Sequence, residues 1–578
     1  MNIRQFLDKH VAAAMQRAGA PAGASAVIQP SGRPEFGDYQ ANGAMAVAKA
    51  LRMPPRAFAE KIVNELDLSG IAERIDIAGP GFINITLSKD WLGAQAARAV
   101  NDVRLGVERA AQPQTIVVDY SSPNLAKEMH VGHLRSTIIG DAVVRVLEFL
   151  GHRVIRQNHV GDWGTQFGML IAYIERLRGS GDAQLSMALE DLETFYRNAK
   201  QSFDSDAQFA DTARAYVVKL QQGDAHCLAL WRQFIDVSLG HCERVYERLG
   251  VTLTRADVKP ESAYNDDLPR VIDALRQHGL LSESEGALCV FLDEFKGKDG
   301  EPLPVIVQKS DGGYLYATTD LAAIRHRVGT LHADRILYFV DARQSLHLKQ
   351  VFAVARRAGF ATDAVSMEHH PFGTMMGEDG KPFKTRSGGT VKLVELLEEA
   401  EQRAFAVVNE KNATLGEAQR RDIARAVGVG AVKYADLSKN RINDYIFSWN
   451  TMLALDGNTA PYLLYAYARI ASIFRRGEIG AGDAAQTVVI NEPQERHLAL
   501  TLLRFSEVVD TVGRECYPNL LCSYLYDLAG AFMQFYEACP VLKADEPVRS
   551  SRLALCRLSA ATLQQGLRLL GINTIEQM

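Results

Sequence analysis

Two histidines, His130 and His133, flank a valine and a glycine where a predicted strand gives way to a predicted helix. The β-branched run at 115–118 predicts a buried strand, and apolar residues at helical spacing across 134–150 predict the helix. A helix N-terminus presents free N–H groups and the positive end of the helix dipole, so the junction favours a phosphate ligand. Gly132 has no Cβ and lets a nucleotide approach the backbone closely. The residues by themselves therefore predict a phosphate site, although two nearby histidines alone are a weak signal.

The elements expected around this junction form a parallel βαβ unit, with a second strand at 153–159. Residues 175–250 predict a helical insertion, and 283–312 predict a β-rich insertion with Asp-Gly turns. The chain is then expected to return to the sheet at 314–320 and 336–344. No G-x-G-x-x-G follows these strands, which argues against a dinucleotide dehydrogenase. The predicted fold is a doubly wound, Rossmann-like parallel sheet with insertions.

The size and composition fit a multidomain globular protein. A chain of 578 residues predicts three or four domains, and 47% hydrophobic with 23% charged residues is ordinary. The net charge of −5 does not indicate nucleic-acid binding, but local basic faces remain possible. No apolar run approaches the roughly 20 residues of a membrane span, and the N-terminus lacks a signal peptide's apolar core. Seven scattered cysteines without a C-x-x-C pair predict neither a disulfide framework nor a zinc site, as in reducing cytoplasm.

The string SSPNLAKEMHVGHLRST at 121–137 contains a version of the HIGH motif of class I aminoacyl-tRNA synthetases, and as a whole it resembles the arginyl-tRNA synthetases. The resemblance extends over essentially the whole chain. It implies an α+β N-terminal domain at 1–110 that contacts the tRNA elbow, and a class I catalytic domain at 111–455. It also implies an all-α, DALR-type anticodon-binding domain at 456–578.

The resemblance also implies the substrate sites. The expected ATP-binding residues are His130, Gly132, His133 and Lys384, and the expected catalytic residues are His130, His133, Lys127, Lys384 and Arg386. A guanidinium is a rigid fork of donors that requires carboxylates in bidentate geometry. The expected arginine-binding residues are Asp119, Ser122, Asn124, Glu261, Tyr316, Asp320 and Gln344, with Glu261, Tyr316 and Asp320 at the guanidinium. For Asp320, a helix N-cap before the segment that follows it is an equally good alternative.

A Gly- and Lys-rich loop lies at 377–389, before a helix expected to start near Leu393. A solvated surface turn is the simplest interpretation. By resemblance it is the KMSKS loop, but the residues Lys384-Thr385-Arg386-Ser387 lack the family-wide second lysine. Lys127, just upstream of the histidines, occupies the position thought to compensate in many family members. Positive charge near the phosphates, with Mg²⁺ assisting, is what the chemistry requires.

Two aromatic segments are candidate RNA contacts. Phe36, Tyr39 and Gln40 could stack on and hydrogen-bond an unpaired base, as RNA is usually read, or they could form an ordinary turn with an aromatic core plug. In the C-terminal helices, an aromatic stripe at helical spacing is more often core than a base platform. By resemblance, the residues near the anticodon are Tyr462, Tyr465, Arg469 and Met578.

The implied activity is ATP-dependent activation of L-arginine and its transfer to tRNA(Arg), generally with bound tRNA required for activation. We expect a cytoplasmic monomer with no membrane or DNA partner and no editing domain. Three alternatives exist, and features of the sequence count against each of them. Another nucleotidyl transferase would lack the helical RNA tail, and a cysteinyl-type synthetase would show zinc-ligand cysteines. A catalytically altered paralogue acting as an RNA-binding or regulatory protein would have lost part of the motif set.

Overall fold

The computed structural model describes residues 1–125, 127–179, 192–298, 300–384, 391–411, 415–477 and 487–577. The chain divides into two compact units. Unit 1 contains Met1–Ala110 with Ala454–Leu569 and Asn573–Met578, and unit 2 contains Ala111–Leu453 with Leu570–Ile572. The N-terminal and C-terminal domains expected from the sequence thus belong to one compact unit. Their separate boundaries stay a prediction.

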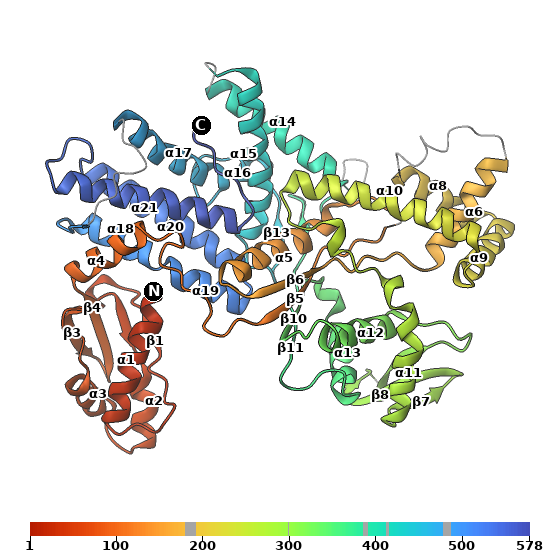
Figure 1. Ribbon diagram of the computed structural model, residues 1–578, viewed down its shortest axis with the longest axis horizontal. Coiled ribbons are helices and arrows are strands. Elements are labelled where there is room, and N and C mark those ends of the chain that lie inside the picture. Colours follow the sequence, from red (N-terminus) through yellow and green to blue (C-terminus); the bar gives the residue numbers. More distant parts are fainter. Residues whose placement is uncertain are drawn as a thin grey trace. The chain divides into compact units, whose positions relative to one another are not determined.

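Unit 1 begins with an antiparallel sheet in the order β1-β2-β4-β3. Its strands are β1 (Ile28–Pro30), β2 (Tyr39–Ala41), β3 (Ala72–Ala78) and β4 (Phe82–Leu87). Strands β3 and β4 form an antiparallel pair on either side of the turn Gly79-Pro80-Gly81. Three helices pack beside the sheet (Figure 1): α1 (Ile3–Arg17), α2 (Gly43–Ala50) and α3 (Pro55–Glu65). The short 3-10 helix Pro34–Phe36 precedes β2.

The rest of unit 1 is helical, as expected. Helix α4 (Lys89–Val100) leaves the sheet and packs against two helices from the other end of the chain, α18 and α21. The C-terminal helices are α17 (Ala460–Gly477), α18 (Pro493–Leu503), α19 (Phe505–Glu515), α20 (Pro518–Ala538) and α21 (Val548–Leu569). Long apolar faces, such as Leu521, Leu525, Leu528, Phe532 and Phe535 of α20, are fully buried between them.

Unit 2 is built on a parallel sheet in the order β11-β10-β5-β6, with every neighbouring pair parallel. Its strands are β5 (Thr115–Asp119), β6 (Arg153–Gln157), β10 (Arg335–Tyr338) and β11 (Ser366–His369). The crossover helices are α5 (Val131–Phe149), α12 (Tyr316–Gly329) and α13 (Ser345–Arg357). The carboxyl ends of β5 and β10 lie side by side, where ligands of such sheets bind.

The two expected insertions are present in unit 2. The helical one comprises α6 (Thr165–Gly179), α8 (Leu192–Ser205), α9 (Ala207–Gln221) and α10 (Ala225–Leu249). The β-rich one is an antiparallel sheet of β7 (Leu281–Ser284), β8 (Ala287–Lys296) and β9 (Pro302–Gln308), preceded by α11 (Leu268–Gln277). The strand expected at 314–320 is wrong, because Tyr316 begins helix α12. Unit 2 ends with β12 (Met375–Met376), α14 (Leu393–Lys411), α15 (Glu417–Leu437), β13 (Tyr445–Ile446) and α16 (Trp449–Met452).

Local sequence explains how α5 is set against β5. Ile116, Val117 and Val118 of β5 have no exposed area, as the β-branched run predicts. A Cβ on Gly140 of α5 would lie 2.4 Å from the Tyr120 ring, so only glycine permits this close approach of helix and strand end.

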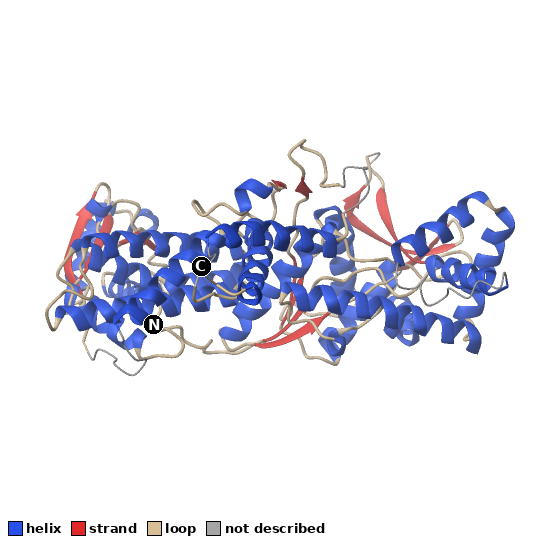
Figure 2. Ribbon diagram, turned by 90° about the horizontal axis from the view of Figure 1, so that it is seen from above, coloured by secondary structure: helices blue, strands red, loops and turns tan. Residues whose placement is uncertain are grey.

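Helices dominate the chain and the strands gather in short sheets (Figure 2). No helix in the described residues is long and apolar enough to cross a membrane.

Candidate active site

Helix α5 begins at the histidine pair. His130 is the N-cap residue, and its Nδ1 accepts a hydrogen bond from the Gly132 N–H at 3.0 Å. The His133 Nδ1 accepts from the His130 N–H at 3.1 Å, and the two ring centroids lie 4.0 Å apart. The pair is therefore a reciprocal helix cap in which both Nδ1 atoms are occupied by backbone donors.

Both imidazoles are neutral near pH 7. Burial, followed by the neighbouring His130, lowers the pKa of His133 to about 3. Burial, followed by the Lys127 charge, lowers the pKa of His130. Since Nδ1 accepts in each ring, the single proton of each neutral imidazole resides on Nε2. The site thus has two neutral Nε2–H donors, suited to phosphate oxygens, at the positive end of a helix.

Gly132 is required by the cap itself. A Cβ at this position would lie 2.8 Å from Cε1 of the His130 ring, which folds back over the first turn. The glycine is exposed, so the backbone beside the histidines is open. Glycine is therefore favoured at position 132 for two reasons: it leaves room for the His130 ring, and it allows a nucleotide to approach the backbone closely.

Lys127 lies within electrostatic range of both histidines, because its charge lowers the pKa of each. Its Nζ sits 4.4 Å from the centroid of the Tyr196 ring, a cation–π contact. Tyr196 belongs to α8 of the helical insertion. The insertion therefore contributes directly to the placement of a cation beside the histidine pair.

The lysine-rich loop is anchored to the same turn. The Val131 N–H donates to the Val391 carbonyl at 3.1 Å, and the Leu393 N–H donates to the Met129 carbonyl at 2.9 Å. The Lys392 Nζ lies 3.3 Å from the Glu128 carboxylate. Lys384, within the loop, is exposed, while Arg386 lies outside the described residues. Helix α14, which follows the loop, therefore begins in hydrogen-bonding contact with the residues on either side of His130.

Asp119 ends β5 and is buried. Its carboxylate accepts from the Arg327 guanidinium at 2.6 Å and from the Ser122 hydroxyl at 2.9 Å. Arg327 is itself fully buried and also donates to the Gln157 side chain at 2.6 Å. Both Asp119 oxygens already have a partner, so only their remaining lone pairs are available to a substrate amine.

Three carboxylates lie together beside this strand end. Burial, and then the charges of Asp162 and Asp320, raise the pKa of Glu261 to about 8. Burial and the nearby Glu261 raise the pKa of Tyr316, whose side chain is still well exposed. The crowding of Glu261, Asp162 and Asp320 is destabilising for three anions and favours a cation among them.

Asp162 fixes Glu261 through the next residue. Its carboxylate accepts from the Ser262 N–H at 2.9 Å and from the Ser262 hydroxyl at 2.5 Å. The Glu261 N–H donates to the Val160 carbonyl at 3.1 Å. Asp162 is buried, and burial raises its pKa. Glu261 is therefore held on a paired backbone rather than on a loose loop.

Asp320 is not a helix N-cap. Leu315 is the N-cap of α12, and Asp320 lies in the second turn on the same face as Tyr316, four residues earlier. Its Oδ2 lies 2.6 Å from Nε2 of His347, and this hydrogen bond raises the histidine pKa. The N-cap alternative is wrong because the helix starts one turn earlier than the apolar pattern suggests.

Asn124 and Gln344 are both exposed, and they follow the ends of β5 and β10 respectively. Asn124 pairs with Gly161 in a parallel bridge, and a Cβ on Gly161 would lie 2.0 Å from the Asn124 Oδ1. Gln344 closes the 3-10 turn Ala342–Gln344 that follows β10. Together with Asp119, they surround the strand ends where the histidine-capped helix also begins.

The three N-terminal candidates for RNA contact differ in how exposed their side chains are. Phe36 and Gln40 are partly exposed, and Gln40 donates to the Asn84 side chain at 2.8 Å. Tyr39 as a base-stacking residue is wrong, because its ring has no exposed area and its hydroxyl donates to Glu507 at 2.5 Å. A base would have to displace packed protein to reach this ring.

The C-terminal candidates form an aromatic surface on α17. Tyr465 is 42% exposed, so the alternative that it belongs to the core is wrong for this residue. Tyr462 packs against Tyr526 with centroids 5.5 Å apart, and the Arg469 guanidinium lies 5.2 Å from the Tyr536 ring centroid. Met578 lies outside the described residues.

Sequence reasoning missed four residues of the site: Asp162, Tyr196, Arg327 and His347. Asp162 had a visible signal, since it follows the second strand in the turn Gly161–Gly164. The others lie on helices α8, α12 and α13 with no motif of their own, and only the packing brings them to the site.

Three family models match the chain in order. The Arginyl tRNA synthetase N terminal domain matches residues 5–87, and the catalytic domain of class I (R) tRNA synthetases matches residues 96–449. The DALR anticodon binding domain matches residues 463–578. Together with the parallel sheet and its histidine-capped helix, these matches define a class I aminoacyl-tRNA synthetase.

Comparison with individual relatives shows which family within this class the chain belongs to. The chain is 62% identical to the arginine–tRNA ligase of Hahella chejuensis and 60% identical to that of Laribacter hongkongensis, over 100% of every chain. It superposes on the arginyl-tRNA synthetase of Plasmodium falciparum with a TM-score of 0.85 at 30% identity, covering 100% of this chain and 99% of that one. For the Thermus thermophilus arginyl-tRNA synthetase, the TM-score is 0.84 at 27% identity, covering 100% of both chains. The chain belongs to the arginyl-tRNA synthetase family.

Proposed function

We propose that this chain joins L-arginine to tRNA(Arg) at the expense of ATP, releasing AMP and pyrophosphate. The observation that carries the proposal is the crowding of Glu261, Asp162 and Asp320: burial, and then repulsion by the other two carboxylates, raises the pKa of Glu261 to about 8. A guanidinium removes this repulsion, since it is always charged and offers a fork of donors. A neutral amino acid does not relieve it.

In the proposed complex, Glu261 and Asp320 accept from the guanidinium, and Tyr316 covers it. Asn124, Gln344 and Ser122 lie toward the α-amino and carboxyl groups, at the ends of β5 and β10. Asp119 acts at this end of the substrate while Arg327 holds its carboxylate in place. Selectivity needs no editing step, because a side chain without the guanidinium leaves buried carboxylates unpaired.

In the first step, an oxygen of the arginine carboxylate forms a bond to the ATP α-phosphorus, and the bond to pyrophosphate breaks. The Nε2–H groups of His130 and His133 donate to phosphate oxygens, and Gly132 allows close contact with the nucleotide. Lys127, Lys384 and Arg386 neutralise the leaving pyrophosphate, and Mg²⁺ bound together with ATP would supply further positive charge. In the second step, a hydroxyl of the terminal tRNA ribose attacks the arginyl carbonyl and AMP leaves.

For tRNA, we propose that Phe36 and Gln40 contact the elbow and that Tyr462, Tyr465, Arg469 and Met578 contact the anticodon. Exposed aromatic and arginine side chains suit unpaired bases. The proposal includes a monomer that acts in the cytoplasm on tRNA rather than on DNA or a membrane. The described cysteines support this location, since all seven are free, buried thiols.

The test is ATP–pyrophosphate exchange with each amino acid in turn, in the presence of total tRNA, followed by aminoacylation of the RNA. Only arginine should give exchange, and the product should be arginyl-tRNA. Exchange with another amino acid would overturn the substrate assignment. Binding of tRNA without any exchange would support a catalytically altered paralogue, which the full motif set and the ligase relatives do not favour.

A further inference from the structure

The segment Phe36–Gln40 is fastened to the helical part of unit 1. Asp38 is buried, and its two carboxylate oxygens accept from the two terminal nitrogens of Arg496 at 2.9 and 2.7 Å. Arg496 lies on α18, more than 450 residues further along the chain. A bidentate pair of this kind fixes direction as well as distance.

The same pair is tied into both backbones. Asp38 also accepts from the Leu87 N–H at 2.7 Å, and Arg496 donates to the Leu87 carbonyl at 2.9 Å. The Arg504 guanidinium donates to the Asp38 carbonyl at 2.9 Å. Because these groups are withdrawn from water, removal of one partner leaves the others poorly compensated.

Tyr39 makes the next contact. Its hydroxyl donates to the Glu507 carboxylate of α19, and the Arg504 guanidinium lies 5.1 Å from its ring centroid. The Glu507 carboxylate also accepts from the Arg4 N–H at 3.0 Å. One buried carboxylate thus receives donors from both a strand and a helix of the N-terminal residues.

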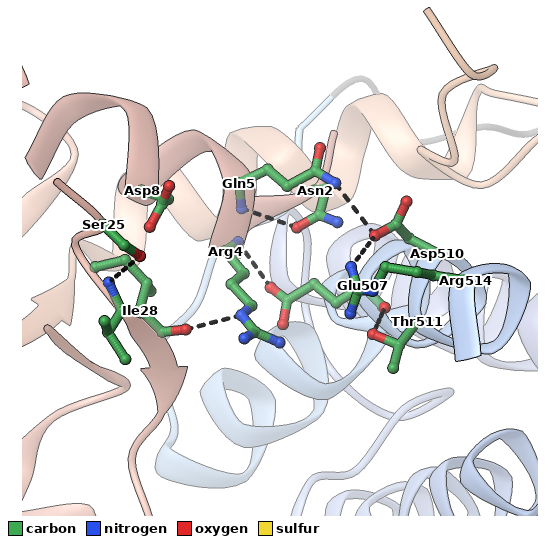
Figure 3. Close-up of a pocket in the computed structure, with 11 residues that line it drawn as sticks. Asn2, Arg4, Gln5, Asp8, Ser25, Ile28, Glu507, Asp510, Thr511 and Arg514 are labelled. Atoms are coloured by element: carbon green, nitrogen blue, oxygen red, sulfur yellow. Dashed lines mark hydrogen bonds and ion pairs between the residues drawn. The ribbon is translucent and has the colours of Figure 1, made fainter. Parts of the chain in front are cut away.

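A polar cleft of about 290 Å³ continues this contact between α1 and α19 (Figure 3). Within it, the Gln5 side chain donates to Asp510 at 3.2 Å. On α4, a Cβ at Gly93 would lie 2.2 Å from the Val488 carbonyl, so the two parts of the chain touch at backbone distance. Polar and steric contacts therefore act together along one interface.

We infer that Asp38, Tyr39, Arg496 and Glu507 form an interdomain lock, which holds the N-terminal domain and the anticodon-binding helices as one rigid tRNA-binding body. These are positioning residues that act through the RNA-contacting surfaces on either side. The inference rests on the proposed function, because it assumes that both surfaces bind one tRNA. It assigns a role to the segment whose tyrosine is too buried to stack on a base.

Rigidity matters because two contacts to one ligand reinforce each other only when their spacing is kept. Once one surface has bound tRNA, a fixed second surface meets it at high effective concentration. A loosely held N-terminal domain would lose conformational freedom when tRNA binds. This entropy cost would reduce the gain in affinity. The lock should therefore affect the KM for tRNA and leave the arginine and ATP sites unchanged.

The test compares Asp38→Asn and Tyr39→Phe with Asp76→Asn, a control in the exposed Arg74–Asp76 ion pair of the same sheet. Each lock variant should raise the KM for tRNA about tenfold, a modest share of the gain available from linked contacts. The kcat at saturating tRNA and the KM for arginine should stay within twofold of wild type. An unchanged KM for tRNA in folded lock variants would overturn the inference, even if the melting temperature fell.

A covalent lock provides the second test. Cysteines at positions 5 and 510, introduced as Gln5→Cys and Asp510→Cys, would be joined by a short bis-maleimide. The cross-linked enzyme should charge tRNA normally, and cross-linking should return the KM of the Asp38→Asn variant toward wild type. Loss of charging on cross-linking, or no recovery, would show that the fixed arrangement is not the working one. Failure of the wild type to charge tRNA with arginine would instead refute the proposed function.

Discussion

At the scale of single residues, the role proposed for the histidine pair relies on its neutral form. A phosphate would ordinarily favour protonated histidine, but burial holds the pKa of His133 at about 3. The ring nitrogens also face in fixed directions, since the backbone occupies both Nδ1 atoms. In the proposed mechanism, this pair therefore acts through directed donors rather than through full positive charge.

His133→Ala removes one of these donors. A donor aimed at developing charge contributes about 3 kcal/mol, so ATP–pyrophosphate exchange should fall about a hundredfold. The fold and tRNA binding should be nearly unchanged, and exposed His278 provides a control as His278→Ala. Exchange at the wild-type rate, measured with tRNA present, would contradict the assignment.

In the proposed complex, Glu261 makes the binding of arginine dependent on pH. Its pKa of about 8 in the empty site means that the carboxyl is largely protonated at pH 7. A bound guanidinium favours the carboxylate, so binding expels a proton and the KM for arginine should fall as pH rises toward about 8. The limit is tenfold per pH unit for one proton.

Glu261→Gln should abolish most of this dependence and raise the KM for arginine, whereas Glu283→Gln, at an exposed position, should change neither. Calorimetry in buffers of different ionisation enthalpy would count the released proton directly. Binding that is independent of pH in the wild type would argue against Glu261 as a guanidinium ligand.

At the scale of elements, the site is assembled by segments far apart in sequence. Helix α5 supplies the histidines, the start of α14 is hydrogen-bonded to its cap, and α8 of the insertion holds Lys127 through Tyr196. The helical insertion is thus connected to the chemistry, although it carries no nucleotide motif.

Tyr196→Leu tests this connection. An exposed cation–π contact contributes about 0.5–1 kcal/mol, so exchange should slow about two- to fivefold. Tyr196→Phe retains the ring and should behave like wild type, while Lys127→Ala should slow exchange much further. If Lys127→Ala matches wild type at saturating tRNA and ATP, Lys127 does not compensate for the missing lysine of the loop.

At the scale of the whole molecule, the short segment Leu570–Ile572 that follows α21 belongs to the catalytic unit. The buried Lys433 of α15 donates to the Gly571 carbonyl at 2.6 Å and to the Leu249 carbonyl at 2.8 Å. Burial lowers the pKa of Lys433 to about 8. One ammonium thus joins the segment Leu570–Ile572 to the end of α10.

Lys433→Met should destabilise the catalytic unit by about 3 kcal/mol, since hydrogen bonds from a charged donor are lost and two carbonyls are left buried. The folded pKa lies below the value of 10.5 for an ordinary lysine, so the unfolded chain binds more protons between pH 8 and 10.5. The contribution of Lys433 to stability therefore rises with pH over this window. Denaturant unfolding at pH 8 and 9.5, with exposed Lys439→Met as the control, should show a larger deficit at the higher pH; a constant deficit would contradict the depressed pKa.

Where the local residue pattern and the tertiary packing agree, the sequence alone was sufficient to predict the helix or strand. The strand before the histidines, the helix after them and both insertions followed from apolar spacing and turn residues, whereas the helical tail was expected from the family resemblance. The start of α12 did not, because its first turn carries Tyr316 and threonines, which lack an apolar stripe. Local periodicity has little information where a helix begins in a polar turn.

The sequence by itself determined the residue types of the site and their order along the chain, since a motif of contiguous residues needs no tertiary contact to be read. Only the tertiary structure decided which side chains are free to act. Tyr39 is an interdomain hydrogen-bond donor because α19 covers it, Asp119 is held by an arginine that lies 208 residues away, and Glu261 is crowded by carboxylates from two other segments. Burial and charge at a side chain depend on every segment that packs against it, and a linear pattern does not contain that information.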